Sequence, residues 1–112
     1  MKRGEVWWAD LPAPVGKRPV LLLSRDKAYA IRNAVTVATI TRTVRNIPVE
    51  VALGEAQGLP KPCVVNLDDI LTVPKRFLVT RIGALDSEKM VQVAVAIHFA
   101  LDLRDCAQAG FS

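Results

Sequence analysis

The sequence has few of the residues that metal sites and nucleophilic enzymes commonly use. Its 112 residues include one histidine, His98, and two cysteines, Cys63 and Cys106. A single histidine cannot divide acid and base work between two imidazoles within one chain. The cysteines lie far apart and form no CxxC pattern, so neither a zinc site nor a disulfide is indicated, and we expect two buried thiols. No cofactor is predicted.

Long hydrophobic runs are also missing. None approaches the roughly 20 residues that a membrane-spanning helix needs, and the start, Met1 to Glu5, has no apolar stretch of the signal-peptide kind behind it. We therefore expect a cytoplasmic protein with no membrane contact. Hydrophobic residues make up 51% of the chain and are spread along it, which predicts one folded domain over 1–103 with a short tail at 104–112.

The fold class expected from the pattern is α+β, mainly β. Short β-branched or alternating segments separated by Pro, Gly and polar turns are typical of a small barrel. The expected strands are 4–9, 20–24, 34–40, 48–53, 63–67, 69–73 and 78–82. The run 20–24 is apolar throughout, which predicts a strand that is buried on both faces. Trp7 and Trp8 are adjacent in an extended segment, so they should point to opposite faces.

One helix is expected near the C-terminus. Asp86 or Ser87 can cap its start, and 88–103 contains no Gly or Pro. Its core face should consist of Met90, Ala94, Ile97 and Leu101, which share one side of a helical wheel. A second apolar side, made of Val91, Val95 and Phe99, has no place in that stripe and predicts a subunit interface.

Several familiar catalytic motifs do not fit. Asp68 and Asp69 are neighbours, but in an extended segment their side chains diverge, so a turn role is favoured over metal binding. Gly16-Lys17 lacks the other residues of a phosphate loop. No metal site is therefore predicted.

The remaining chemistry is carried by arginines and threonines at predicted strand ends. The chain has 15 basic and 11 acidic side chains, and this modest excess favours a polyanionic partner without requiring one. Arginine presents a fork of donors that matches phosphate, and threonine adds a neutral donor. Solvated strand ends would look the same. The residues concerned are Arg18, Arg25, Thr41, Arg42, Thr43 and Arg45, with Arg76 and Arg81 later in the chain.

Taken in order along residues 1–103, these segments resemble the MazF/PemK/Kid family of type II toxin–antitoxin ribonucleases. The similar segments are Lys2 to Leu11 (KRGEVWWADL), Gly16 to Ser24 (GKRPVLLLS), Thr39 to Thr41, Val65 to Ile70 and the closing helix from Gly83 onward. The resemblance implies an SH3-like β-barrel with a C-terminal helix, the CcdB/MazF/PemK fold. It also implies a homodimer whose interface carries the RNA groove.

The function that the resemblance implies is sequence-specific cleavage of single-stranded RNA without metal or cofactor, which would inhibit translation and growth. Messenger RNA is the expected target, with ribosomal or transfer RNA as alternatives. Arg18 and Thr41 fall on the family's catalytic pair. Lys17, Arg25, Arg42, Thr43 and Arg45 are the expected RNA-binding residues. The expected protein partner is a cognate antitoxin whose acidic C-terminal segment lies in the RNA groove.

The segment Leu11 to Lys17 departs from the family pattern, because it is short and has no acidic residue. This departure leaves open whether RNA specificity and antitoxin gating follow the family. Two other readings stay open at this stage. One is a gyrase-poisoning toxin of the CcdB type, although the ending Ala109 to Ser112 lacks that group's aromatic helix tip. The other is a non-catalytic SH3-like module that binds nucleic acid or peptide.

Overall fold

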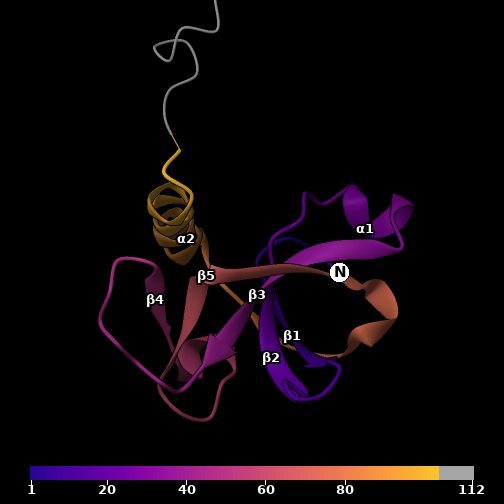
Figure 1. Ribbon diagram of the computed structural model, residues 1–112, viewed down its shortest axis with the longest axis horizontal. Coiled ribbons are helices and arrows are strands. Elements are labelled where there is room, and N and C mark those ends of the chain that lie inside the picture. Colours follow the sequence, from indigo (N-terminus) through magenta and orange to yellow (C-terminus); the bar gives the residue numbers. More distant parts are fainter. Residues whose placement is uncertain (104–112) are drawn as a thin grey trace, which may run out of the picture.

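The computed structural model describes residues 1–103 and shows six strands, two α-helices and two 3-10 turns (Figure 1). The predicted tail at 104–112, which includes Cys106, lies outside the described residues. In chain order the elements are β1 (Glu5–Asp10), β2 (Lys17–Leu22), α1 (Ala28–Ile31), β3 (Ala34–Thr41), β4 (Glu50–Leu53), η1 (Glu55–Gln57), β5 (Cys63–Pro74), η2 (Lys75–Phe77), β6 (Leu78–Ala84) and α2 (Ser87–Ala100). Within residues 1–103, no helix is long and apolar enough to cross a membrane.

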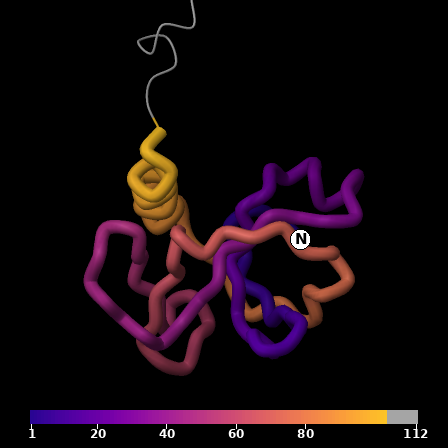
Figure 2. Tube along the Cα trace, viewed as in Figure 1, coloured from indigo at the N-terminus to yellow at the C-terminus, as the bar shows by residue number. Residues whose placement is uncertain are grey.

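All six strands belong to one antiparallel sheet in the order β4-β5-β3-β2-β1-β6. The mainly-β class with a C-terminal helix is confirmed. The barrel differs from the expected one because the edge strands β4 and β6 do not pair. The tube in Figure 2 shows how the strands curve around instead. The η1 turn fills the seam: a side chain carbon at Gly83 of β6 would lie 2.1 Å from the carbonyl oxygen of Gln57, so the two backbones are in direct contact.

The predicted break between 63–67 and 69–73 is wrong, because β5 runs through both segments. The polar residues around Asp68 do coincide with an irregularity in the strand pairing, however. Ala38 of β3 pairs with Ile70 of β5, whereas Ile40, two residues further along β3, pairs with Val65, five residues back along β5. The side chain of Asn66 accepts a hydrogen bond from the amide of Asp68 (2.9 Å), which supports this bend. The polar residues mark a bend within one strand.

Strand β2 is buried on both faces, as its apolar run predicts. Leu21 packs in the core beneath α2, together with Val65 and Val93. Val20 and Leu22 pack on the opposite side, in a second core beneath α1 that includes Tyr29. The strand therefore forms the partition between two cores, and its position is fixed from both sides.

The helix α2 begins as predicted, with the Asp86 carboxylate accepting a hydrogen bond from the Lys89 amide (2.8 Å). Two of the four predicted core residues, Met90 and Ile97, pack against the core beneath α2. The centre of the buried face differs from the predicted one, because Val93 and Ala96 are the fully buried positions, whereas Leu101 follows the end of the helix at Ala100 and is 56% exposed. The low contrast between the two apolar sides of the helix explains the error.

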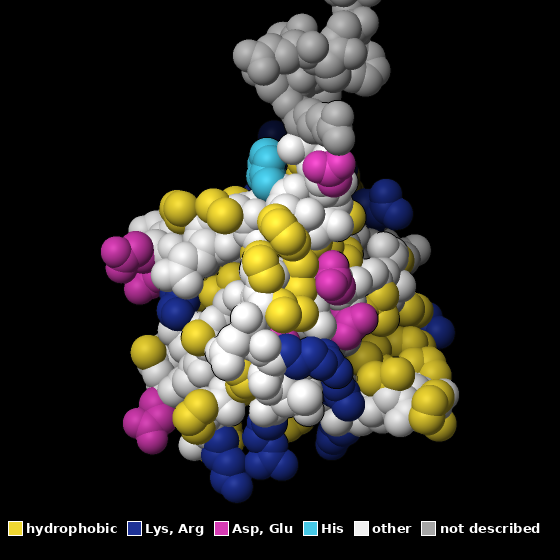
Figure 3. Space-filling view, turned by 60° about the vertical axis from the view of Figure 1, so that its left-hand side comes forward, with side chains coloured by type: hydrophobic (Ala, Val, Ile, Leu, Met, Phe, Trp, Pro, Cys, Tyr) yellow, Lys and Arg dark blue, Asp and Glu magenta, His cyan; other side chains and the backbone are white. Residues whose placement is uncertain are grey.

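The second apolar side of α2 is exposed as predicted. Val91, Val95 and Phe99 are 63%, 65% and 60% exposed. Figure 3 shows hydrophobic side chains exposed on the side of the molecule that carries this helix. Such a contiguous apolar strip is a typical feature of protein interfaces.

Candidate active site

The pairing of β2 with β3 brings Arg18 and Thr41 together. The register joins Val20 to Thr39 and Leu21 to Ala38. The paired ladder ends at Val20 and Thr39, and the same register continued by two residues along each strand leads to Arg18 and Thr41, which both line one pocket. Both side chains are half-buried. The two residues are 23 positions apart in the sequence, and the pairing of β2 with β3 brings both of them to the same pocket.

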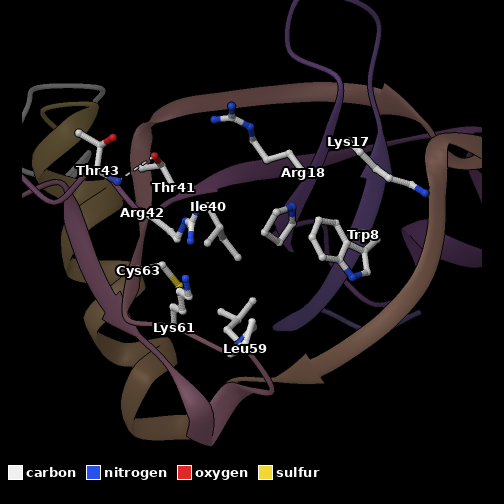
Figure 4. A pocket seen from close by; sticks show the side chains of 12 residues that line it. Trp8, Lys17, Arg18, Ile40, Thr41, Arg42, Thr43, Leu59, Lys61 and Cys63 are labelled. Atoms are coloured by element: carbon white, nitrogen blue, oxygen red, sulfur yellow. Dashed lines mark hydrogen bonds between the residues drawn. The ribbon is translucent and has the colours of Figure 1, made fainter.

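A pocket of about 620 Å³ opens beside this pair (Figure 4). Lys17 and Arg18 of β2 line it on one side, and Thr41, Arg42 and Thr43 line it at the end of β3. The other walls come from β1 and from the segment before β5. They consist of Trp8, Pro19, Ile40, Leu59, Pro60, Lys61 and Cys63.

The Thr41 hydroxyl has a defined orientation. Its oxygen accepts a hydrogen bond from the amide of Thr43 (3.1 Å), which is drawn as a dashed line in Figure 4. A hydroxyl that accepts in this way keeps its own proton for another acceptor. Within residues 1–103, no acceptor for that proton is present. Thr41 is therefore able to donate to a ligand in the pocket.

The pocket is strongly cationic. Four of its lining residues are Lys17, Arg18, Arg42 and Lys61, and no carboxylate lines it. None of the four forms an ion pair within the described part of the chain, where the ion pair present joins Arg81 to Glu5. Uncompensated cations in a recess concentrate a field that attracts anions. The pocket can thus accept a phosphodiester.

The pocket lining also includes one aromatic side chain, Trp8, and one thiol, Cys63. Trp7 and Trp8 point to opposite faces as predicted: Trp7 packs against the core beneath α1, and Trp8 is 39% exposed in the pocket. An exposed indole beside cations can stack on a nucleobase. Cys63 is a buried free thiol, as expected, and burial raises its pKa, so it is a poor nucleophile here.

Two of the predicted RNA-binding residues do not line the pocket. Arg25 lies in the segment between β2 and α1, at the opposite end of β2 from Arg18. Arg45 is exposed in the loop after β3, where its amide and that of Asn46 donate to the Glu50 carboxylate (2.9 Å each). The five other predicted residues, Lys17, Arg18, Thr41, Arg42 and Thr43, lie together.

Sequence reasoning missed Lys61. It belongs to the segment Gly54 to Pro62, which reads as a loop with two glycines and two prolines and gives no functional signal. The contact between η1 and Gly83 holds this loop against the sheet. Leu59, Pro60 and Lys61 of the loop then form a wall of the pocket that is separate from the β2 residues. Only the tertiary contact identifies this cation.

Metal-ligating residues do not gather in this part of the chain. Within residues 1–103, no three His, Cys, Asp or Glu side chains lie close enough together to hold a metal ion. The chemistry that this lining offers is binding of a phosphate by arginine and lysine, and hydrogen-bond donation by threonine.

Comparison with known proteins gives this pocket its context. Residues 2–101 match the family described as PemK-like, MazF-like toxins of type II toxin–antitoxin systems. The probable endoribonuclease MazF5 of Mycobacterium tuberculosis is 39% identical over 101 residues, which is 89% of this chain and 92% of that protein.

Solved structures agree in fold. The Mycobacterium tuberculosis toxin MazF-mt6 superposes with a TM-score of 0.84 at 37% identity, covering 90% of this chain and 99% of the toxin. A mycobacterial endoribonuclease in complex with its cognate antitoxin has a TM-score of 0.83 at 30% identity, covering 94% of this chain and 98% of that one. The chain belongs to the PemK-like, MazF-like family of toxins of type II toxin–antitoxin systems.

Proposed function

We propose that this protein is the toxin of a type II toxin–antitoxin pair, and that it cuts single-stranded RNA at the pocket beside Arg18 and Thr41. The observation that carries the proposal is the cationic pocket that both of these side chains line. The related endoribonucleases support the reaction class. A cytoplasmic location would give the enzyme access to its substrate.

The reaction suited to these side chains is attack by the 2′-hydroxyl on the adjacent phosphorus. The 2′-oxygen forms a bond to phosphorus as the bond to the 5′-oxygen breaks, and the proton lost from the 2′-hydroxyl is balanced by one gained at the leaving oxygen. Negative charge grows on the non-bridging oxygens in the transition state. Arg18 donates to those oxygens through its fork, and Thr41 adds a neutral donor.

Arg18 has a further expected role in proton transfer. A guanidinium is already protonated and has no lone pair available to accept a further proton, so it cannot act as a base in that form. Charge stabilisation is therefore the principal contribution that we assign to Arg18. Lys17, Arg42 and Thr43 bind the neighbouring phosphates and bases in this proposal.

The test uses purified protein and a long single-stranded RNA in EDTA, with cut sites mapped by primer extension. Thr41→Val removes the hydroxyl at nearly constant shape, and Thr41→Ser restores it. Arg18→Gln removes the charge, and Arg18→Lys keeps it without the fork. We expect Thr41→Val and Arg18→Gln each to lower the cleavage rate about 10²- to 10³-fold, as loss of one transition-state donor does.

Two controls separate this reaction from its alternatives. A 2′-deoxy substitution at a mapped cut site should abolish cutting there, because the nucleophile is gone. If the parent protein cuts no RNA, catalysis is rejected, and assays for gyrase inhibition and for simple nucleic-acid binding decide between the remaining functions.

We also propose that the protein forms a homodimer and is inhibited by an acidic antitoxin segment. The exposed strip of Val91, Val95 and Phe99 on α2 supplies the apolar surface for the dimer contact. The cations of the pocket would attract the acidic segment, which would then compete with RNA. Light scattering of the parent and of Val95→Glu tests the first part, since one carboxylate per subunit in that strip should yield monomers.

A further inference from the structure

A second cationic surface lies at the opposite end of the sheet from the pocket. Three segments meet there. The Arg3 amide donates to the Asp26 carboxylate (2.7 Å), the Lys75 amide donates to the Asn33 carbonyl (2.7 Å), and the Lys75 ammonium donates to the Tyr29 carbonyl (2.6 Å). The N-terminus, the α1 region and η2 are therefore held side by side, on one side of the molecule in Figure 1.

These segments carry most of the chain's positive excess. We call their six exposed cations the α1 cation surface: Lys2, Arg3, Arg25, Lys27, Arg32 and Arg76. Two carboxylates lie beside them, so the local excess is four: Asp26, and Glu5, which accepts a hydrogen bond from the Lys2 amide (3.0 Å) and pairs with Arg81. The whole chain has 15 cations and 11 carboxylates, so the rest of the sequence has nine of each. The basic character of the protein is thus concentrated at this end.

The cations of this surface are available for a ligand. Arg25, Lys27 and Arg32 are exposed, and within residues 1–103 their side chains make no hydrogen bond or ion pair. Arg76 lies over the ring of Phe77, with its guanidinium carbon 5.2 Å from the ring centre, which holds the planar group in place. Four of the six are arginines, whose forks match phosphate oxygens.

The surface and the pocket are joined by two strands. β2 begins with Lys17 at the pocket and leads toward Arg25, and β3 runs back from Ala34, beside Arg32, to Thr41. Eight residues of extended chain in β3 span about 23 Å. A single RNA strand that enters the pocket can cover this distance with several nucleotides, so both sites can contact one substrate molecule.

We propose that the α1 cation surface binds the sugar–phosphate backbone of single-stranded RNA at nucleotides outside the cut site. This inference rests on the proposed ribonuclease function. RNA is favoured over an acidic protein segment, because β2 and β3 connect this surface to the pocket in which the RNA would be cut. The contact would strengthen binding of long RNA without reading its sequence.

The test compares two triple variants. In the neutral variant, Arg25→Gln, Lys27→Gln and Arg32→Gln are combined. In the matched control, Arg25→Lys, Lys27→Arg and Arg32→Lys keep every charge. Both carry Thr41→Val so that RNA stays intact, and binding is followed by anisotropy of an unstructured, labelled RNA of about 30 nucleotides, several site sizes long.

Each phosphate contact to single-stranded nucleic acid contributes about 0.7 to the slope of log K against log salt. Loss of three contacts should therefore reduce the slope by about 2 and weaken binding in 0.1 M salt on the order of 100-fold. The charge-preserving control should keep the parent's slope. An unchanged slope in the neutral variant would overturn the inference.

Two further measurements separate this inference from the proposed function. With Thr41 restored, the neutral variant should cut a short RNA that spans only a mapped site at the parent's rate. If the parent cuts RNA and the long-RNA slope does not change, only the second surface is rejected. If the neutral variant loses affinity for polyglutamate while its RNA binding is retained, the surface belongs to an acidic protein partner and the inference is wrong.

Discussion

Replacing Gly83 with alanine should force apart the contact that fills the seam of the sheet. The added carbon would lie 2.1 Å from the Gln57 carbonyl oxygen and 2.8 Å from its carbonyl carbon. Ordinary contact begins at 3.4 Å, so the shortfall to the oxygen is 1.3 Å. Both neighbouring atoms are backbone, and no side-chain rotation relieves the overlap. Either β6 or η1 has to move.

The expected cost follows from the kind of overlap. Overpacking in a closed site costs about 1–3 kcal/mol, and a rigid backbone neighbour favours the upper end. The better strand propensity of alanine returns about 0.5–1 kcal/mol. We therefore expect Gly83→Ala to lower the free energy of unfolding by about 2 kcal/mol, which for a domain of this size corresponds to a Tm lower by about 8–16 °C.

Gly54→Ala is the matched control, because nothing lies within 4 Å of the added carbon at Gly54. We expect this variant to stay within about 0.5 kcal/mol of the parent. Urea denaturation followed by circular dichroism measures both variants, at one protein concentration so that any dimerisation contributes equally. Equal midpoints for the two variants would refute the direct backbone contact as the means by which the seam is filled.

Three further changes test other parts of the structure. Burial by itself raises the pKa of Glu5, but hydrogen bonds from Trp7, Arg81 and the Lys2 amide, with the charge of Arg81, lower it below its ordinary value. The contribution of Glu5 to stability should therefore be complete above its unfolded-state pKa and be lost as pH falls through its folded-state pKa. In acid denaturation, the free energy of unfolding of Glu5→Gln should fall less with pH than that of the parent. Parallel curves of stability against pH would contradict this. Leu21→Ala empties a fully buried position and should cost about 2–5 kcal/mol in urea denaturation, and a cost below 1 kcal/mol would mean that the core is misassigned. Trp8→Ala should weaken RNA binding by about 1–3 kcal/mol through lost stacking, measured by anisotropy in the Thr41→Val background, while Trp8→Phe should retain most of it.

Much of the fold can be predicted from local pattern. The apolar run of β2 and the capping carboxylate Asp86 each have a direct physical meaning, and the structure agrees with both. The two errors arise where local pattern is ambiguous. The polar pair Asp68 and Asp69 reads as a turn, whereas it lies in a bend of one continuous strand. In α2, apolar residues occur on more than one side, so periodicity alone cannot select Val93 and Ala96 as the buried centre.

The candidate site was predictable to the extent that it depends on strand ends. Lys17, Arg18 and Thr41 to Thr43 meet because two consecutive strands pair, and adjacent strands in sequence usually do. Lys61 and Arg25 show the limit of that reasoning. Lys61 reaches the pocket through a contact between a loop and β6, and Arg25 is carried away from it by the length of β2. Neither position is encoded in local sequence pattern.

Because a loop fills the seam between β4 and β6, one wall of the pocket does not depend on the pairing of the strands. The pocket wall formed by Leu59, Pro60 and Lys61 belongs to a loop that lies outside the hydrogen-bonded ladder. Pro60 and Lys61 are exposed, and exposed loop positions tolerate substitution well, whereas Leu59 is buried in the core beneath α2. The Arg18 and Thr41 side can therefore remain constant while the opposite wall diversifies. In evolutionary terms, the exposed part of this wall can change, and substrate preference with it, while the residues contributed by β2 and β3 stay the same.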